Sequence, residues 1–168
     1  MRDNWNGNET STHSVIFNFA DAKAISETFG KMQQCNAAAN LFAVIKENTQ
    51  SVSQQLVRTL VAGGDYTKDT TYTVWRTKVT DEATYVAAYE KLMAAQEKAG
   101  LVNGAYGLWR VQGGADSNVT HIAFLGAKNL ETLLENGTPS KAFAVFQKKV
   151  AGIRTIYRSN INLVIADL

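Results

Sequence analysis

The stretch Tyr72-Thr-Val-Trp-Arg-Thr-Lys-Val79, followed directly by Thr80-Asp81, decides the fold. Its β-branched and aromatic residues alternate with polar ones, which is typical of a half-buried strand. Either Thr80 or Asp81 is a suitable N-cap, and apolar residues recur at helical spacing between Val86 and Met93. The stretch therefore predicts a strand that is followed by a long helix ending at Gly100, a residue type favoured just past a helix.

The pattern continues towards the C-terminus with alternating strand and helix signals. A Pro is well placed at the first position of a helix, where its missing N–H costs nothing, so Thr138-Pro139 is expected to start one. Gly152 is expected to close that helix. The expected elements after residue 100 are strands 106–112 and 119–125, a short helix 130–134, a helix with Phe143, Phe146 and Val150 as its core stripe, and strand 153–165. The order β-α-β-β-α-β predicts an α+β, ferredoxin-like antiparallel sheet with helices on one face.

The first half of the chain is expected to echo this unit. Segments 14–19 and 41–45 read as strands, and Asp21 as the N-cap of a helix with Ile25, Phe29 and Met32 on its buried side. Segment 54–62 fits a helix or a strand, and the parallel with 106–125 favours a strand. The resulting expectation is a flexible polar arm at 1–12, a partial βαββ unit at 13–66 and a complete βαββαβ unit at 70–168. Two such diverged units can cover each other's open sheet faces and form an α+β barrel.

Segment 72–165 resembles the dimeric α+β barrel superfamily, which includes the antibiotic-biosynthesis-monooxygenase-like proteins. The resemblance rests on the element order and on the stretch Phe124-Leu-Gly-Ala-Lys-Asn-Leu-Glu-Thr-Leu-Leu-Glu-Asn-Gly-Thr-Pro-Ser-Lys-Ala-Phe143. This stretch is similar to the strand, short helix, Pro-containing break and second helix of that family. The resemblance implies a fold and, through the varied activities of its members, no particular reaction.

Composition excludes several classes of function. The 168 residues are 45% apolar and 19% charged with a formal charge of +2, and Lys and Arg occur without a basic run, so nucleic acid is not an expected partner. The single cysteine, Cys35, permits no intrachain disulfide, and it is read as a small core residue. No apolar run is long enough for a membrane span, and no membrane partner is expected. The expected compartment is open: a soluble protein, cytoplasmic or exported after removal of a signal.

Strand alternation suggests which side chains share a face of the sheet. One set is expected to face the helices: Trp75, Trp109, Val111, Ile122, Phe124 and Ile156. The opposite face is then expected to carry Tyr72, Arg76, Tyr106, Arg110, His121 and Tyr157. Arginines there would hold a carboxylate or enolate-like oxygen, and a histidine would move a proton near neutral pH. Because the side-chain period is two, a shift of one residue in any strand would break up this set.

Two functional hypotheses follow. In the first, the chain is a small-molecule-binding barrel, either a cofactor-independent oxygenase-like or an isomerase-like enzyme. Arg76, Arg110 and His121 would then be catalytic, Tyr72, Tyr106 and Tyr157 would bind a small hydrophobic or anionic ligand, and neither a metal nor a cofactor is expected. In the second, the sheet face serves self-association in a non-catalytic structural or interaction module. Both hypotheses predict a homo-oligomer or intramolecular pairing of the two halves.

Overall fold

The structure, a computed structural model, describes residues 1–5, 10–114, 118–136 and 140–165. The chain divides into two compact units. The sheet unit consists of Met1–Ser14 and Ser53–Leu168, and the helical unit is Val15–Val52. Each unit is described by itself below.

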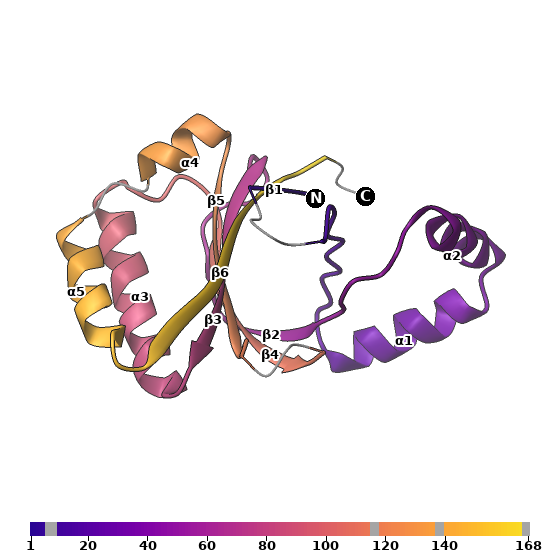
Figure 1. The fold of residues 1–168 in the computed structure, drawn as a ribbon, viewed down its shortest axis with the longest axis horizontal. Coiled ribbons are helices and arrows are strands. Elements are labelled where there is room, and N and C mark those ends of the chain that lie inside the picture. The colour runs from indigo at the N-terminus through magenta and orange to yellow at the C-terminus, as the bar shows by residue number, and fades with distance from the viewer. Residues whose placement is uncertain (6–9, 115–117, 137–139, 166–168) are drawn as a thin grey trace. The chain divides into compact units, whose positions relative to one another are not determined.

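The sheet unit is a six-stranded antiparallel sheet with helices on one face (Figure 1). The strands have the order β1-β6-β3-β5-β4-β2. Their bounds are β1 Arg2–Asn4, β2 Leu56–Gly63, β3 Thr71–Val79, β4 Tyr106–Gly113, β5 His121–Ala127 and β6 Arg154–Leu163. The helices are α3 Glu82–Lys98, α4 Leu130–Asn136 and α5 Lys141–Val150. From β3 to β6 the chain has the predicted βαββαβ order, so the ferredoxin-like prediction is confirmed.

The helices begin and end where their capping residues require. The side chain of Asp81 accepts a hydrogen bond from the backbone N–H of Thr84 at 3.0 Å, and Gly100 follows α3 with φ of 68°. Ser140 caps α5 by accepting from the Phe143 N–H at 3.0 Å. The helix therefore starts at Lys141, and the predicted start at Thr138-Pro139 lies outside the described residues.

Aromatic rings from α3 and α5 form the core above the sheet. Tyr85, which is 1% exposed, lies 5.9 Å from Phe146 between ring centroids, and Tyr89 lies 6.3 Å from Phe146. Below them the strands supply smaller side chains, among which Leu108 is fully buried. The Tyr89 hydroxyl donates to the Gly107 carbonyl at 3.1 Å, so the one polar atom of this buried ring is satisfied.

The two edge strands of the sheet, β1 and β2, agree with the expectation only in part. Within 1–12, predicted as a flexible arm, Arg2–Asn4 form β1 and pair with β6. Segment 54–62 does form a strand, β2, which pairs with β4 and so extends the main sheet. In the part of the chain that the structure describes, β1 and β2 are the two edges and do not pair with each other. The sheet is thus open, and its closure into a barrel by a second unit stays a prediction.

The helical unit contains α1 Ala22–Gln33 and α2 Asn36–Asn48. Asp21 caps α1 as predicted, accepting from the Ala24 N–H at 2.7 Å. The predicted strand 41–45 is wrong: it lies inside α2, where a run of three alanines from Ala37 favours a helix. The predicted strand 14–19 is also wrong, because this segment pairs with no strand among the described residues. Instead the ring of Phe19 packs on those of Phe17 and of Phe29 in α1.

The helical unit exposes most of its apolar side chains. Neither α1 nor α2 contains a buried residue, and Cys35 is exposed, so its expected place in the core is wrong. Because segment 41–45 is helical, the expected echo of the second half of the chain loses one of its strands. The proposal of a partial βαββ unit at 13–66 therefore rests on β2 alone.

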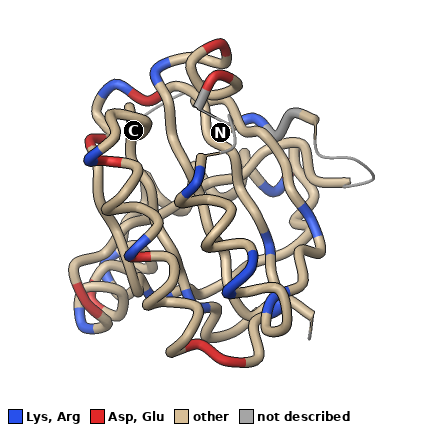
Figure 2. Tube along the Cα trace, turned by 90° about the vertical axis from the view of Figure 1, so that its left-hand side faces the viewer, with Lys and Arg blue, Asp and Glu red and all other residues tan. Residues whose placement is uncertain are grey.

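Charged residues of both signs are interspersed along the chain. Figure 2 shows Lys and Arg as separate, scattered segments of the chain, with Asp and Glu among them. Within the described residues, no helix combines the length and the apolar character needed to cross a bilayer.

Replacing Phe146 by alanine tests the packing of α5 on the sheet. Because the ring is 5% exposed and contacts two tyrosines of α3, Phe146→Ala should lower the free energy of unfolding by about 3–5 kcal/mol. Val145→Ala, at a neighbouring side chain that is 70% exposed, is the control and should change it by less than about 0.5 kcal/mol. Urea denaturation of both variants measures the difference, and equal losses would show that α5 packs through another face.

Candidate functional site

The helix-facing side chains differ from the predicted set in two of the four strands. Trp75 and Ile156 face α3 and α5 as predicted. In β4 and β5 the alternation is shifted by one residue. Leu108 and Ala123 lie in the core under the helices, whereas Trp109 packs against Phe124 on the opposite face, with ring centroids 4.6 Å apart. The prediction, made from strand alternation, placed Trp109 and Phe124 on the helix-facing side. It is wrong for Trp109, Ile122 and Phe124, which alternate with the core residues Leu108 and Ala123, because α3 and α5 themselves supply the aromatic bulk. Val111 lines the polar groove described below.

This shift separates the six predicted site residues. Arg110, His121 and Tyr106 lie on the helix side, where Arg110 and His121 contact Glu82 and Tyr106 donates to Glu97 at 3.0 Å. The other three are elsewhere. Arg76 and Tyr72 lie on the opposite face, and Tyr157 falls at the register shift between β3 and β6. The structure therefore does not assemble the predicted set in one place.

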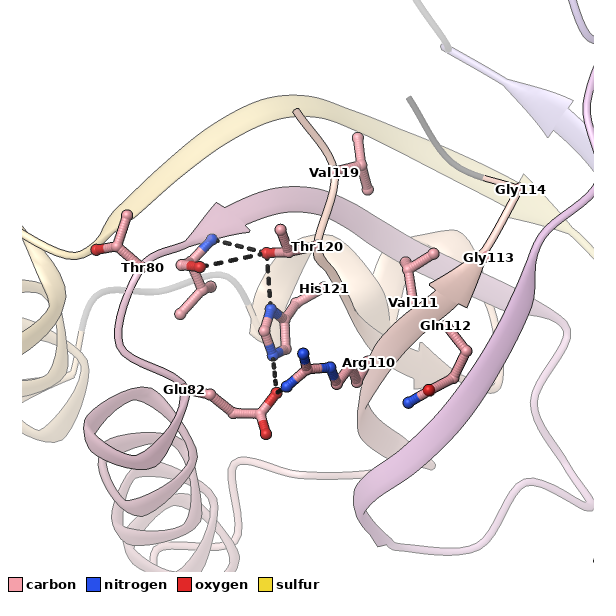
Figure 3. A pocket seen from close by; sticks show the side chains of 11 residues that line it. Thr80, Glu82, Arg110, Val111, Gln112, Gly113, Gly114, Val119, Thr120 and His121 are labelled. Carbon is pink, nitrogen blue, oxygen red and sulfur yellow. Dashed lines mark hydrogen bonds and ion pairs between the residues drawn. The ribbon is translucent and has the colours of Figure 1, made fainter. Parts of the chain in front are cut away.

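A polar groove of about 410 Å³ brings two of the predicted residues together at the start of α3 (Figure 3). One oxygen of Glu82, Oε2, accepts from Arg110 at 2.6 Å and lies 2.9 Å from His121 Nε2. The other ring nitrogen, Nδ1, lies 2.9 Å from Thr120 Oγ1. Since both nitrogens of His121 have partners, the ring is held in one orientation.

The charges in this groove follow from burial and from these contacts. Burial lowers the pKa of His121 below its usual value, and the nearby Glu82 carboxylate opposes this only in part. Burial acts to raise the pKa of Glu82, but the hydrogen bonds from His121 and Arg110 outweigh it and leave that pKa below the ordinary value. At neutral pH the groove thus holds a neutral imidazole between a hydroxyl and a carboxylate that also pairs with a guanidinium.

Sequence reasoning missed Glu82 and Thr120. Glu82 occupies the first position of α3, directly after the N-cap Asp81, where an acidic residue is expected for its interaction with the helix dipole alone. Thr120 precedes β5 and carries no signal of its own. Both would have been found only by knowing which end of β4 and β5 meets the start of α3.

A second site lies between the helices and the sheet. This aromatic cavity measures about 220 Å³. It is lined by Trp75, Tyr85, Tyr89, Leu92, Met93, Gln96, Ala123, Leu125, Phe143, Phe146, Gln147, Arg154 and Ile156. Arg154 is the only charged residue of that lining. Its guanidinium donates to Gln147 Oε1 at 2.5 Å and lies 5.2 Å from the centre of the Phe146 ring.

Asp69 is a buried acid that the sequence did not single out. Its Oδ2 accepts the Ala105 N–H at 2.8 Å, and a Cβ atom at either Gly104 or Gly126 would overlap its carboxyl group. No donor among the described residues reaches Oδ1, and burial raises the pKa of this carboxyl. Asp69 therefore ties the start of β3 to the start of β4 at an electrostatic cost.

Metal ligands are sparse in the described residues, where no three His, Cys, Asp or Glu side chains gather in one place. The residues that line the groove and the aromatic cavity do not form a glycine-rich phosphate-binding motif.

The titration of His121 tests the geometry of the groove. Because its pKa in the folded protein lies below the unfolded value of about 6.5, its contribution to stability is present above pH ~6.5 and is lost as the pH falls through the folded pKa. NMR of the imidazole should give a pKa below 6.5, lowered further in Glu82→Gln and raised in Arg110→Gln. Equal values in the three proteins would contradict the contacts described.

Comparisons with known proteins support the fold and leave the activity open. No protein-family model matches the sequence, and no curated protein matches it. Among solved structures, the chain is similar to a protein of Fusobacterium nucleatum named "putative monooxygenase", with 13% identity, a TM-score of 0.54 and coverage of 86% of this chain and 66% of that one. A Lactobacillus acidophilus protein of the same name matches with 11% identity, a TM-score of 0.52 and coverage of 89% and 72%. At this identity the likeness concerns the fold alone, and it agrees with the α+β, ferredoxin-like fold predicted from the sequence.

Proposed function

We propose that this protein binds a small hydrophobic molecule of one or two rings, carrying an anionic or enolate-like oxygen, in the aromatic cavity. The observation that supports this most is the lining itself, which combines five aromatic residues with a single charged one, Arg154. A cavity of about 150 Å³ accommodates benzene, so 220 Å³ is suited to a molecule of one or two rings.

Arg154 determines the polarity of the proposed ligand. Its contacts with Gln147 and the Phe146 ring leave its positive charge without a carboxylate among the lining residues. A ligand oxygen that carries negative charge would supply that partner through a charge-assisted hydrogen bond. The rings of Phe146 and Tyr85 would meanwhile contact the apolar body of the ligand.

The fold supports a second, finer candidate function, which is oxygenation without a cofactor. In such a reaction an acidic ring methylene reacts with O₂: one oxygen atom becomes the carbonyl, the other leaves as water, and the substrate supplies all four electrons. The cavity lining holds neither a carboxylate nor a histidine that would take the first proton. The substrate must therefore ionise easily, and Arg154 would stabilise the resulting enolate.

The catalytic roles predicted for Arg76, Arg110 and His121 cannot be assigned to this cavity, because none of the three lines it. Arg110 and His121 line the polar groove, and any role for them belongs there. Self-association through the open sheet face, the alternative function, stays a prediction.

Binding of 2-naphthoate tests the ligand proposal, with 2-naphthalenemethanol as its uncharged counterpart. Arg154→Met should weaken naphthoate binding by about 10-fold to 100-fold, the loss of one hydrogen bond to a charged group, and should affect the alcohol much less. Arg158→Met, on the same strand, is the matched control and should leave both affinities unchanged. Leu92→Trp should fill the cavity and abolish binding of both compounds, as measured by calorimetry.

Absence of naphthoate binding to the wild-type protein, or binding that survives Leu92→Trp, would contradict the ligand proposal. Oxygen uptake with 2-tetralone, a two-ring ketone with an acidic methylene, separately tests the oxygenase candidate. One O₂ should be consumed per ketone, with one atom of ¹⁸O₂ recovered in the product and no uptake by Leu92→Trp. Naphthoate binding without oxygen uptake would retain the binding function and reject oxygenation of this ketone class.

A further inference from the structure

Three side chains in the polar groove form a continuous line of hydrogen bonds (Figure 3). Thr120 Oγ1 lies 2.9 Å from Nδ1 of His121, and Nε2 of the same ring lies 2.9 Å from Oε2 of Glu82. The order is hydroxyl, imidazole, carboxylate. Both distances are those of ordinary hydrogen bonds, so each neighbouring pair is in direct contact.

The direction of these bonds follows from the chemistry of their ends. Glu82 is ionised at neutral pH and accepts only, so the proton shared with it belongs to Nε2 of His121. Nδ1 of the neutral ring then carries a lone pair facing Thr120. The other acceptors for the hydroxyl proton are the carbonyls of Thr77 and Val79, both 3.5 Å away, so Nδ1 at 2.9 Å is the preferred one.

Thr120 is accessible and polarised. It lines the groove and is only partly buried, whereas the His121 side chain is 3% exposed. The backbone N–H of Val79 donates to Thr120 Oγ1 at 2.9 Å and would stabilise negative charge that develops on that oxygen. A hydroxyl oxygen has two lone pairs, so Oγ1 retains one besides the pair that accepts from Val79.

We propose that Thr120 is a nucleophile for acyl transfer from small carboxylic esters, with His121 as its general base and Glu82 as the positioning carboxylate. Oγ1 attacks the ester carbonyl carbon as its proton passes to Nδ1, and Glu82 holds the imidazolium through Nε2–H. The tetrahedral adduct breaks its bond to the alkoxy oxygen, which leaves with the proton from Nδ1. Water then releases the acid from acyl-Thr120 by the same steps.

The groove indicates the size of the ester. Its lining includes the short side chains of Thr80, Val111 and Val119, which suit a small acyl group. Arg110 is a positioning residue: it donates to the same Glu82 oxygen that contacts His121 and so fixes the carboxylate in place. This site is separate from the aromatic cavity, and its activity does not depend on the ligand proposed there.

A second Thr–His pair in the chain, Thr12 and His13, serves as an internal control for Thr120 and His121. Thr12 Oγ1 lies 3.0 Å from Nδ1 of His13, an adjacent pair of the same kind at a similar distance. This pair is exposed, and among the described residues no carboxylate is hydrogen-bonded to His13. Reaction with p-nitrophenyl acetate followed by peptide mass spectrometry therefore compares the two hydroxyls in one sample. Acetylation at Thr120 should exceed that at Thr12 at least about 10-fold, in line with general-base catalysis.

Variants and pH separate activation from simple exposure. Thr120→Ser should retain p-nitrophenol release, Thr120→Val should abolish it, and Glu82→Gln should slow it by about 100-fold. The groups facing His121 are Glu82 and Tyr85 from α3 and Arg110 from β4. Since His121 is neutral above its depressed pKa, release should be constant between pH 7 and 9.

Two results would overturn the proposal. One is equal acetylation of Thr12 and Thr120. The other is release that rises in proportion to hydroxide across pH 7–9 and is the same in Glu82→Gln. If Thr120→Val does not fold, as judged by circular dichroism, the pH profiles of the wild type and Glu82→Gln decide the question alone.

Discussion

The packing of α3 and α5 on one face of the sheet is the interaction on which the rest of the structure depends. Tyr85, Tyr89 and Phe146 fill the layer between helices and strands, and smaller residues such as Leu108 lie beneath them. This arrangement fixes which residues of each strand face inwards. It also borders both sites, because the aromatic cavity lies within the layer and the polar groove lies where α3 begins.

The two sites divide polar and apolar chemistry between them. The groove holds a His–carboxylate contact, with its imidazole bonded on both sides and its carboxylate shared with Arg110. The aromatic cavity holds one guanidinium, from Arg154, and no group that takes a proton readily. A ligand of the cavity must therefore bring its own acidity, whereas a ligand of the groove meets a ready base. The separation supports two distinct binding roles rather than one composite active site.

The sequence was sufficient for the fold of the sheet unit and insufficient for the site. Capping residues such as Asp81, glycines past helices, and alternation in β3 are local signals, and they predicted the βαββαβ order. The inward face of β4 is a tertiary property: it depends on rings that α3 supplies, and strand alternation alone placed Trp109 rather than Leu108 on the helix-facing side. That error of one position placed Arg110 and His121 with Arg76, from which the sheet separates them. In the helical unit, segment 41–45 has residue types that suit either structure, and its alanine-rich start favours the helix.

The most direct test of the account is a crystal structure of the protein as purified, without added ligand. The account predicts that the aromatic cavity is present between α3, α5 and the sheet, and that any co-purified small molecule lies in it with an oxygen on Arg154. A cavity closed by the rings of Phe143 and Tyr89, or bound density against Arg76 on the opposite face, would contradict it. Density against Arg76 would place the ligand on the other face of the sheet. A closed cavity would leave no room for the proposed ligand.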